Sequence, residues 1–309
     1  MTYALETHGL TKQYKTTLAV SNIDIRVPEG SCCGFLGKNG AGKTTTIKMA
    51  VGLIRPTSGS IAMHGQAHGF GKGGGVPMFG YLPDVPNFYG YMTGAEFLHL
   101  CAKLCNIPKA EAQDRVKKLL QKVGLERTRT RISGYSRGMK QRLGIAQAMI
   151  NSPKIIFMDE PMSALDPMGR RDVSEIISSL KGTTVIFSTH ILADVETVCD
   201  YILIIEKGKL VAQDTMENLR ARHSENTAKI RFFTSQDAAV FFDKAMAAGV
   251  DVAAQDMPLE FVLTASDAKL DGLSRVVNGV VAANNLAVES YAAHTPTLEN
   301  IFYKEIANV

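Results

Sequence analysis

Short apolar runs alternate with helically spaced apolar residues along the chain and predict strands and helices in turn. Runs of strand length occupy residues 4–10, 18–27, 31–37, 154–160, 183–190 and 201–205. Helical spacing of apolar residues covers residues 43–53, 93–123 and 170–180. The continuous apolar runs KIIFMDE (154–160) and TTVIFSTH (183–190) are typical of buried parallel strands, whose C-terminal ends commonly carry functional residues.

A further helix is predicted to begin at the turn in YSRGMKQRLGIAQAMI (135–150). Ser136 is of a type that caps helix N-termini, and Leu143, Ala146 and Ile150 fall on one helical face. A helix N-terminus presented by serine and glycine is suited to an anion.

The character of the sequence changes after Leu219. The polar stretch RARHSENT (220–227) predicts a boundary between a domain of residues 1–220 and a second domain of residues 221–309. Beyond it, short strands at 228–233, 259–265 and 286–293 alternate with helical segments at 235–248 and 268–284. This pattern predicts a small α+β accessory domain, in which we find no catalytic constellation. In the first domain, the glycine-rich stretch GFGKGGG (69–75) predicts a loop.

Composition and charge narrow the class of protein only slightly. The net charge of +4 over 309 residues is too small to argue for nucleic acid, and it suits an anionic ligand or a membrane surface equally well. Five cysteines without a CxxC pair predict buried thiols in a reducing compartment. No stretch approaches the ~20 apolar residues that cross a bilayer, and the N-terminus lacks the pattern of a signal peptide. If the protein works at a membrane, another chain is expected to hold it there.

The strongest chemical signal is GKNGAGKTT (37–45), which fits G-x-x-x-x-G-K-[ST] in full, follows an apolar run and opens a helix. Gly37, Gly40 and Gly42 permit positive φ and let backbone N–H groups close around phosphate oxygens. Lys43 is expected to neutralise the β- and γ-phosphates of a nucleoside triphosphate, and the Thr44 hydroxyl to coordinate Mg²⁺. The remaining motif positions predicted to bind the nucleotide are Asn39, Ala41 and Thr45.

A pair of acids ends the apolar run of IIFMDEP (155–161). Asp159 is expected to hold Mg²⁺ directly or through water, and Glu160 to orient or deprotonate the attacking water. An acid pair at a strand end is on its own more often a solvated terminus, but its combination with the glycine-rich motif favours catalysis. FSTH ends the next apolar run at His190, which gains weight only from this position.

Four motifs, in this order and spacing, resemble the nucleotide-binding subunit of an ABC transporter: GKNGAGKTT, YSRGM, IIFMDEPMSALD and STH. The resemblance covers about residues 3–219. YSRGMKQRL and the C-terminal TLENIFYKEI (297–306) resemble the drug, antibiotic and gliding-type exporters of the ABC-2 group. The implied fold is α/β: a P-loop NTPase with a mixed central sheet, an N-terminal antiparallel β subdomain and a helical subdomain at about residues 84–150.

The resemblance also implies roles for residues outside the strongest motifs. Ser136 and Gly138 fall in the signature motif, which contacts the γ-phosphate of ATP bound to the other subunit of a dimer, and Arg137 replaces the usual first signature glycine. Tyr14 stands where an aromatic ring stacks on adenine, although a strand-edge tyrosine is the alternative. Asp166 belongs to the D-loop, which communicates across the dimer.

His190 corresponds in this family to the switch histidine that reaches the γ-phosphate. Asp84 stands where the family has glutamine, or glutamate in the ABC-2 exporters, and its shorter side chain is expected to reach Mg²⁺ only through water. Aromatic and apolar residues follow it where the family docks the coupling helix of a membrane subunit, with ordinary packing of the helical subdomain as the alternative: Phe88, Tyr89, Tyr91, Met92 and Phe97.

The implied cofactors and partners are ATP, Mg²⁺, a second ATPase subunit in a homodimer or heterodimer, and a separate transmembrane permease. No nucleic acid is expected, and the permease would hold the chain on the cytoplasmic face of the cell membrane. A soluble ABC ATPase acting on nucleic acid or the ribosome is the alternative, but this chain lacks inserted coiled coils and a second ATPase domain. The signature motif and Glu160 argue against a nucleotide kinase or a pure binding module.

Overall fold

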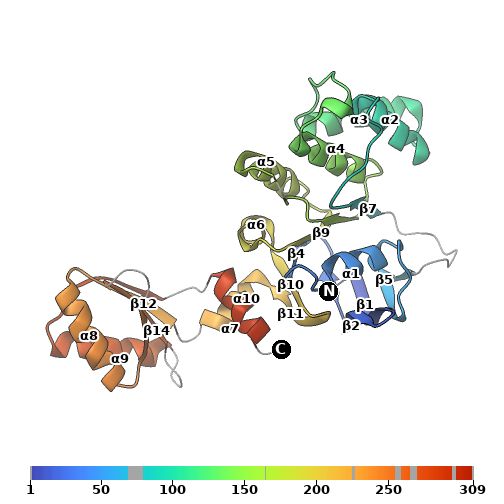
Figure 1. The fold of residues 1–309 in the computed structure, drawn as a ribbon. Helices are drawn as coiled ribbons and strands as arrows, with labels where there is room; N and C mark the ends of the chain where they lie inside the picture. Colours follow the sequence, from blue (N-terminus) through green and yellow to red (C-terminus); the bar gives the residue numbers. More distant parts are fainter. Residues whose placement is uncertain are drawn as a thin grey trace. The chain divides into compact units, whose positions relative to one another are not determined.

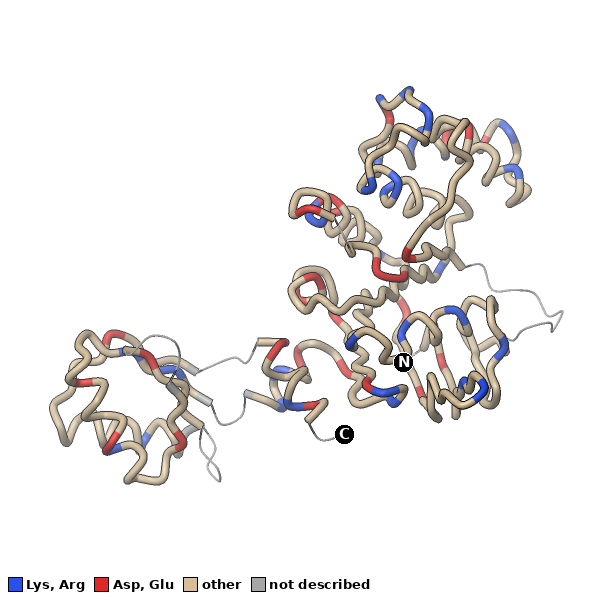
Figure 2. Tube along the Cα trace, viewed as in Figure 1, with Lys and Arg blue, Asp and Glu red and all other residues tan. Residues whose placement is uncertain are grey.

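The computed structural model describes residues 2–68, 79–163, 165–224, 227–254, 259–264, 270–293 and 297–307 (Figure 1). The chain divides into two compact units, Met1–Thr215 and Met216–Ala307. The predicted glycine-rich loop at 69–75 lies outside the described residues. Figure 2 shows Lys and Arg interspersed with Asp and Glu along the trace. Among the helices that the structure describes, none is long and apolar enough to cross a membrane.

A six-stranded sheet in the order β11-β10-β4-β9-β8-β7 forms the centre of the first unit. Its strands are β4 (Cys32–Leu36), β7 (Phe79–Leu82), β8 (Ile155–Asp159), β9 (Thr184–Thr189), β10 (Tyr201–Glu206) and β11 (Lys209–Thr215). Only β11 runs antiparallel to its neighbour. Every residue of β8 and β9 is buried, which explains why both read as continuous apolar runs. Because β4, β8 and β9 are parallel neighbours, their C-terminal ends meet at one edge.

Antiparallel strands form a second sheet in the order β2-β1-β5-β6, with β3 paired to β1. They are β1 (Tyr3–Tyr14), β2 (Thr17–Ile23), β3 (Arg26–Pro28), β5 (Ser58–Met63) and β6 (Gln66–His68). The single strand expected at 18–27 is therefore wrong. Strand β2 ends at Ile23 because Asn22 has a φ of 50°. The buried Thr7 hydroxyl also accepts a hydrogen bond from the Ile25 N–H and donates one to the Ile23 carbonyl.

The helical subdomain contains α2 (Gly94–Leu104), α3 (Lys109–Lys122), a 3₁₀ turn at Ile132–Gly134 and α4 (Arg137–Met149). The helical pattern expected at 93–123 is confirmed as two helices, which are separated because Asn106 takes a φ of 57° and Pro108 starts a new helix. The prediction for α4 is confirmed. The Ser136 hydroxyl accepts from the Met139 N–H at 3.2 Å, and the apolar face with Leu143 is buried.

Helices α1 (Lys43–Ala50), α5 (Pro167–Ser178) and α6 (Leu192–Val198) follow β4, β8 and β9 in the chain. Helix α1 ends earlier than the expected residue 53, and α5 begins earlier than the expected residue 170, because Asp166 caps it ahead of Pro167. Each of these helices therefore begins close to the sheet edge at which the three strands end.

The second unit contains a β-α-β-β-α-β arrangement with an antiparallel sheet in the order β13-β14-β12-β15, which is the ferredoxin-like topology. Its core joins α8 and α9 to one sheet face through residues such as Phe232, Phe241 and Leu273. The short strand β13 was not expected from the sequence. The elements of this unit are α7 (Met216–Ser224), β12 (Thr227–Phe232), α8 (Ser235–Ala247), β13 (Asp251–Ala254), β14 (Glu260–Thr264), α9 (Leu270–Ala283), β15 (Val288–Ala293) and α10 (Leu298–Ala307).

Candidate active site

The turn between β4 and α1 has the backbone that its glycines allow. Gly40 and Gly42 have φ values of 82° and 112°, as expected, and a Cβ on Gly42 would lie 2.7 Å from the Ala19 carbonyl oxygen. Gly37 does not take the positive φ that a glycine permits. Glycine is needed there because a Cβ would lie 2.5 Å from the Ile205 carbonyl oxygen. The turn is thus both conformationally special and tightly packed on its inner side.

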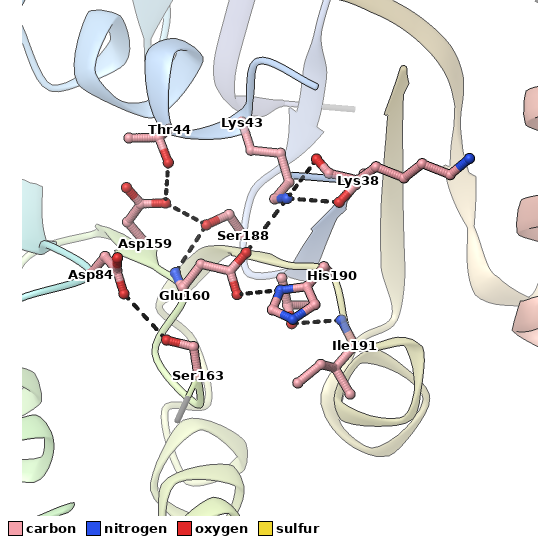
Figure 3. Close-up of polar contacts among 12 residues, drawn as sticks. Lys38, Lys43, Thr44, Asp84, Asp159, Glu160, Ser163, Ser188, His190 and Ile191 are labelled. Atoms are coloured by element: carbon pink, nitrogen blue, oxygen red, sulfur yellow. Dashed lines mark hydrogen bonds and ion pairs between the residues drawn. The ribbon is translucent and has the colours of Figure 1, made fainter. Parts of the chain in front are cut away.

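Lys43 points back across this turn (Figure 3). Its side chain is 6% exposed, and its Nζ donates to the Gly37 carbonyl at 2.7 Å and the Lys38 carbonyl at 3.3 Å. The same Nζ lies 3.5 Å from Glu160 Oε1. A buried ammonium held by carbonyls and a carboxylate is a fixed positive charge at the mouth of the turn.

Asp159 ends β8 as a buried carboxylate with two hydroxyl donors. Thr44 Oγ1 donates to Asp159 Oδ1 at 3.0 Å, and Ser188 Oγ donates to the same oxygen at 2.7 Å. Ser188 Oγ also accepts from the Glu160 N–H at 3.0 Å (Figure 3). Ser188 was not predicted from the sequence. The only available signal was its place two residues before His190 at the end of a buried strand.

Glu160 lies between the buried lysine and the histidine. Its Oε2 is 3.0 Å from His190 Nδ1, and its Oε1 faces Lys43. The Glu160 backbone has a φ of 48°, a conformation that a non-glycine residue adopts at a cost. The side chain is 13% exposed, whereas that of His190 is 43% exposed. The strained backbone therefore places the Glu160 carboxylate at the boundary between the buried site and solvent.

Lys43, Glu160 and His190 line one cleft of about 360 Å³, a size within the range of small-molecule sites. The structure brings the motif residues together with Asp84, Glu160 and His190 around this cleft. Ala19 and Ser163 also line it and were not predicted. The motif residues on its wall are Asn39, Gly40, Ala41, Gly42, Lys43, Thr44 and Thr45.

Asp84 lines the cleft together with its hydrogen-bond partner Ser163. Ser163 Oγ donates to Asp84 Oδ1 at 3.2 Å. Within the described ranges, no group of three or more His, Cys, Asp or Glu side chains is placed to hold a metal ion. Mg²⁺, however, is commonly held by one or two protein oxygens with water and substrate phosphates, and the adjacent oxygens of Thr44 and Asp159 fit that mode.

Six predicted residues do not line this cleft, as far as the described part of the chain shows. Two of them, Gly37 and Asp159, accept hydrogen bonds from the lining residues Lys43 and Thr44. Tyr14 is 45% exposed at the end of β1, with the Lys12 ammonium 4.9 Å from its ring centroid. Ser136 and Gly138 lie at the start of α4. The Asp166 carboxylate caps α5, accepting from the Gly169 N–H at 2.9 Å.

The fold and the site together define a P-loop nucleoside triphosphatase. A buried lysine, an aspartate that accepts from two hydroxyls and a partly buried glutamate lie around one cleft. The family model for ABC transporters matches residues 20–163. The ABC transporter ATP-binding protein YxlF of Bacillus subtilis is 42% identical over 224 residues, covering 72% of this chain and 74% of that protein. The bacitracin transport ATP-binding protein BcrA of Bacillus licheniformis is 40% identical over 227 residues, covering 72% and 73% respectively.

Among solved structures, an ATP-binding subunit of an ABC transporter is 32% identical with a TM-score of 0.64, covering 71% of this chain and 93% of that chain. The chain belongs to the ABC transporter family. It is an ATP-binding subunit of that family and an ATPase. The predicted family and fold class are thereby confirmed.

Proposed function

We propose that this chain hydrolyses Mg²⁺-ATP at the cleft and powers a separate membrane permease that exports its substrate. The observation that carries the proposal is the Glu160 carboxylate, held between Lys43 and His190 beside a hydroxyl-bound Asp159. Export is supported by the similarity to bacitracin transport proteins of two organisms. The permease would hold the chain on the cytoplasmic face of the cell membrane.

The glycine-rich turn would bind the triphosphate. Gly40 and Gly42 line the cleft, and a Cβ built on Gly40 would meet no atom of the described residues within 4 Å. Backbone N–H groups of this turn would close around the phosphate oxygens. Lys43 would exchange its contact with Glu160 for phosphate oxygens. When bound, Mg²⁺ would be held by Thr44 and Asp159 and would neutralise charge on the phosphates, with Asp84 reaching it at most through water.

Glu160 would act as the general base that orients and deprotonates the attacking water. Once Lys43 turns to phosphate, the carboxylate keeps His190 as its partner at 3.0 Å. His190, whose side chain is 43% exposed, would reach the γ-phosphate while it holds Glu160. Ser188 would keep the two acids in place, because its hydroxyl joins Asp159 to the Glu160 backbone.

The signature residues would complete the site of a second subunit, in a homodimer or a heterodimer with a related ATPase. Ser136 is exposed, and among the described residues a Cβ on Gly138 would meet only the Leu165 side chain, at 3.9 Å. Packing against these residues therefore does not require glycine at 138, whereas close approach of a partner's nucleotide would. Arg137 is exposed beside them. Asp166 and Tyr14 would serve the dimer contact and adenine stacking, respectively.

Some of the aromatic residues after Asp84 pack in the interior of the helical subdomain, and others are exposed. Phe97 is 5% exposed and packs edge-on against Phe88, with ring centroids 5.1 Å apart. Tyr89 and Tyr91 are 53% and 65% exposed. We assign Phe97 to the core of the helical subdomain and the two tyrosines to the surface that docks the permease. Residues 1–220 would be the ATPase domain and 221–309 the accessory domain.

Magnesium-dependent turnover of ATP by the purified chain tests the proposal. We expect hydrolysis that stops on addition of EDTA and resumes with excess Mg²⁺. Asp159→Asn should require a higher Mg²⁺ concentration for half-maximal turnover, whereas Asp114→Asn, an exposed carboxylate in an i,i+4 pair with Lys118, should not. Equal Mg²⁺ dependence of both variants and the wild type would contradict the metal assignment, and EDTA-resistant turnover would contradict the proposed function.

A further inference from the structure

Helices α5 and α6 follow the C-terminal ends of β8 and β9 in the chain and pack against each other (Figure 1). Helix α5 follows Asp166 and is anchored in the core by Val173. Helix α6 follows His190 and is anchored by Val195, which fits against β4 so closely that a Cβ on Gly34 would lie 2.6 Å from it. The two helices thus extend from the proposed dimer-contact residue and from the proposed γ-phosphate residue.

One turn along these helices lie two charged residues of opposite sign. Arg170 follows Asp166 by one helical turn, and its N–H donates to the Asp166 carbonyl at 3.0 Å. Asp194 occupies the equivalent place after His190. Both side chains line one groove of about 630 Å³ between α5 and α6. The groove is therefore lined by a guanidinium from α5 and a carboxylate from α6.

Each side chain has one buried atom without a hydrogen-bond partner among the residues that the structure describes, although Arg170 as a whole is only half-buried. Arg170 Nε and Asp194 Oδ2 are each shielded from solvent and unpaired, and Asp194 is only 8% exposed. Burial raises the pKa of Asp194, and the charge of Arg170 opposes that rise. An unpaired buried donor near an unpaired buried acceptor leaves free energy that a small helix movement would recover by pairing them.

We propose that Arg170 and Asp194 are positioning residues, whose side chains pair when the ATP-bound dimer closes and thereby fix α5 against α6. The pair would hold Asp166 and His190 at a set separation, so that engagement of the partner subunit is transmitted to the hydrolytic site. Neither residue would touch ATP. This inference rests on the proposed roles of Asp166 and His190.

A double-mutant cycle in the full chain tests the pairing. Arg170→Met and Asp194→Asn should each lower kcat about tenfold while KM and the affinity of the monomer for ATP change less than about twofold, as expected when one member of a coupled pair is lost. The double variant should lose no more than either single variant. Arg171→Met, on the exposed side of α5 where Arg171 pairs with Glu175, should keep wild-type turnover.

Multiplicative losses in the double variant, or unchanged kcat in either single variant, would overturn the inference. If a single variant fails to fold, the charge-swapped chain Arg170→Asp/Asp194→Arg decides: turnover within about threefold of wild type supports the pair, and lost turnover overturns it. Glu160→Gln is measured in parallel. Retained turnover in that variant would refute the proposed function, whereas lost turnover with multiplicative Arg170 and Asp194 effects would refute only this inference.

Discussion

Replacing Ser188 with alanine removes one hydroxyl from the buried end of β9 and disturbs both acids of the site. Asp159 Oδ1 loses its 2.7 Å donor and keeps only Thr44 at 3.0 Å. The Glu160 N–H loses the hydroxyl but keeps the Ser188 carbonyl at 3.2 Å, so most of the effect falls on Asp159. A hydrogen bond to a charged group contributes about 1.5–3 kcal/mol, and we expect Ser188→Ala to lower the free energy of unfolding by about 2 kcal/mol.

Urea titration measures that loss, with an unchanged slope against denaturant as evidence that the fold is intact. Ser163→Ala is the matched control, because Ser163 donates to the carboxylate of Asp84 at 3.2 Å in an exposed setting, where we expect a loss below about 1 kcal/mol. Ser188→Ala should also slow ATP turnover by about tenfold or more, because Asp159 and Glu160 lose their common support. An equal loss in the free energy of unfolding for the two serine variants would refute the reasoning.

Three further predictions follow from local geometry. Gly42→Ala should lower the free energy of unfolding, measured by urea titration, by about 2 kcal/mol or more, since its Cβ would lie 2.7 Å from the Ala19 carbonyl oxygen. Gly40→Ala should lower it only by the strain of its positive φ, and equal losses in the two variants would refute this prediction. Ser136→Arg should leave ATP binding by the monomer nearly intact in equilibrium titration but abolish turnover. A loss of ATP binding by the monomer would contradict the assignment of the signature motif to the partner subunit's site. Burial lowers the pKa of His68, so the folded state binds this proton less readily than the unfolded chain and stability falls as the pH drops through the ordinary histidine pKa. Melting curves from about pH 8 to about pH 5 should therefore show a smaller loss in His68→Gln, and identical losses would contradict the shift.

The sequence predicts those parts of the site that adjoin one another in the chain. The glycine-rich turn, with its positive φ at Gly40 and Gly42, is encoded within nine residues that join a strand to a helix. The apolar runs within β8 and β9 predict parallel neighbours, and the C-terminal ends of such strands bring Asp159 and His190 toward the turn.

The remainder depends on contacts between distant segments. Ser188 lies 29 residues from Asp159, and its hydrogen bond follows from strand register, which periodicity alone does not give. Gly37 needs glycine because of the Ile205 carbonyl on a strand far along the chain. The division of the expected strand at 18–27 arises from the Thr7 hydroxyl, again a long-range contact.

The central claim is that Glu160 is the base of ATP hydrolysis. The most direct measurement is the turnover of saturating Mg²⁺-ATP by Glu160→Gln, with Glu175→Gln on the exposed side of α5 as the control. We predict a loss of about 100-fold or more, the contribution of a positioned general base, with ATP binding retained and an ATP-bound dimer accumulating in size-exclusion chromatography. Turnover of Glu160→Gln within about threefold of the control would contradict the account.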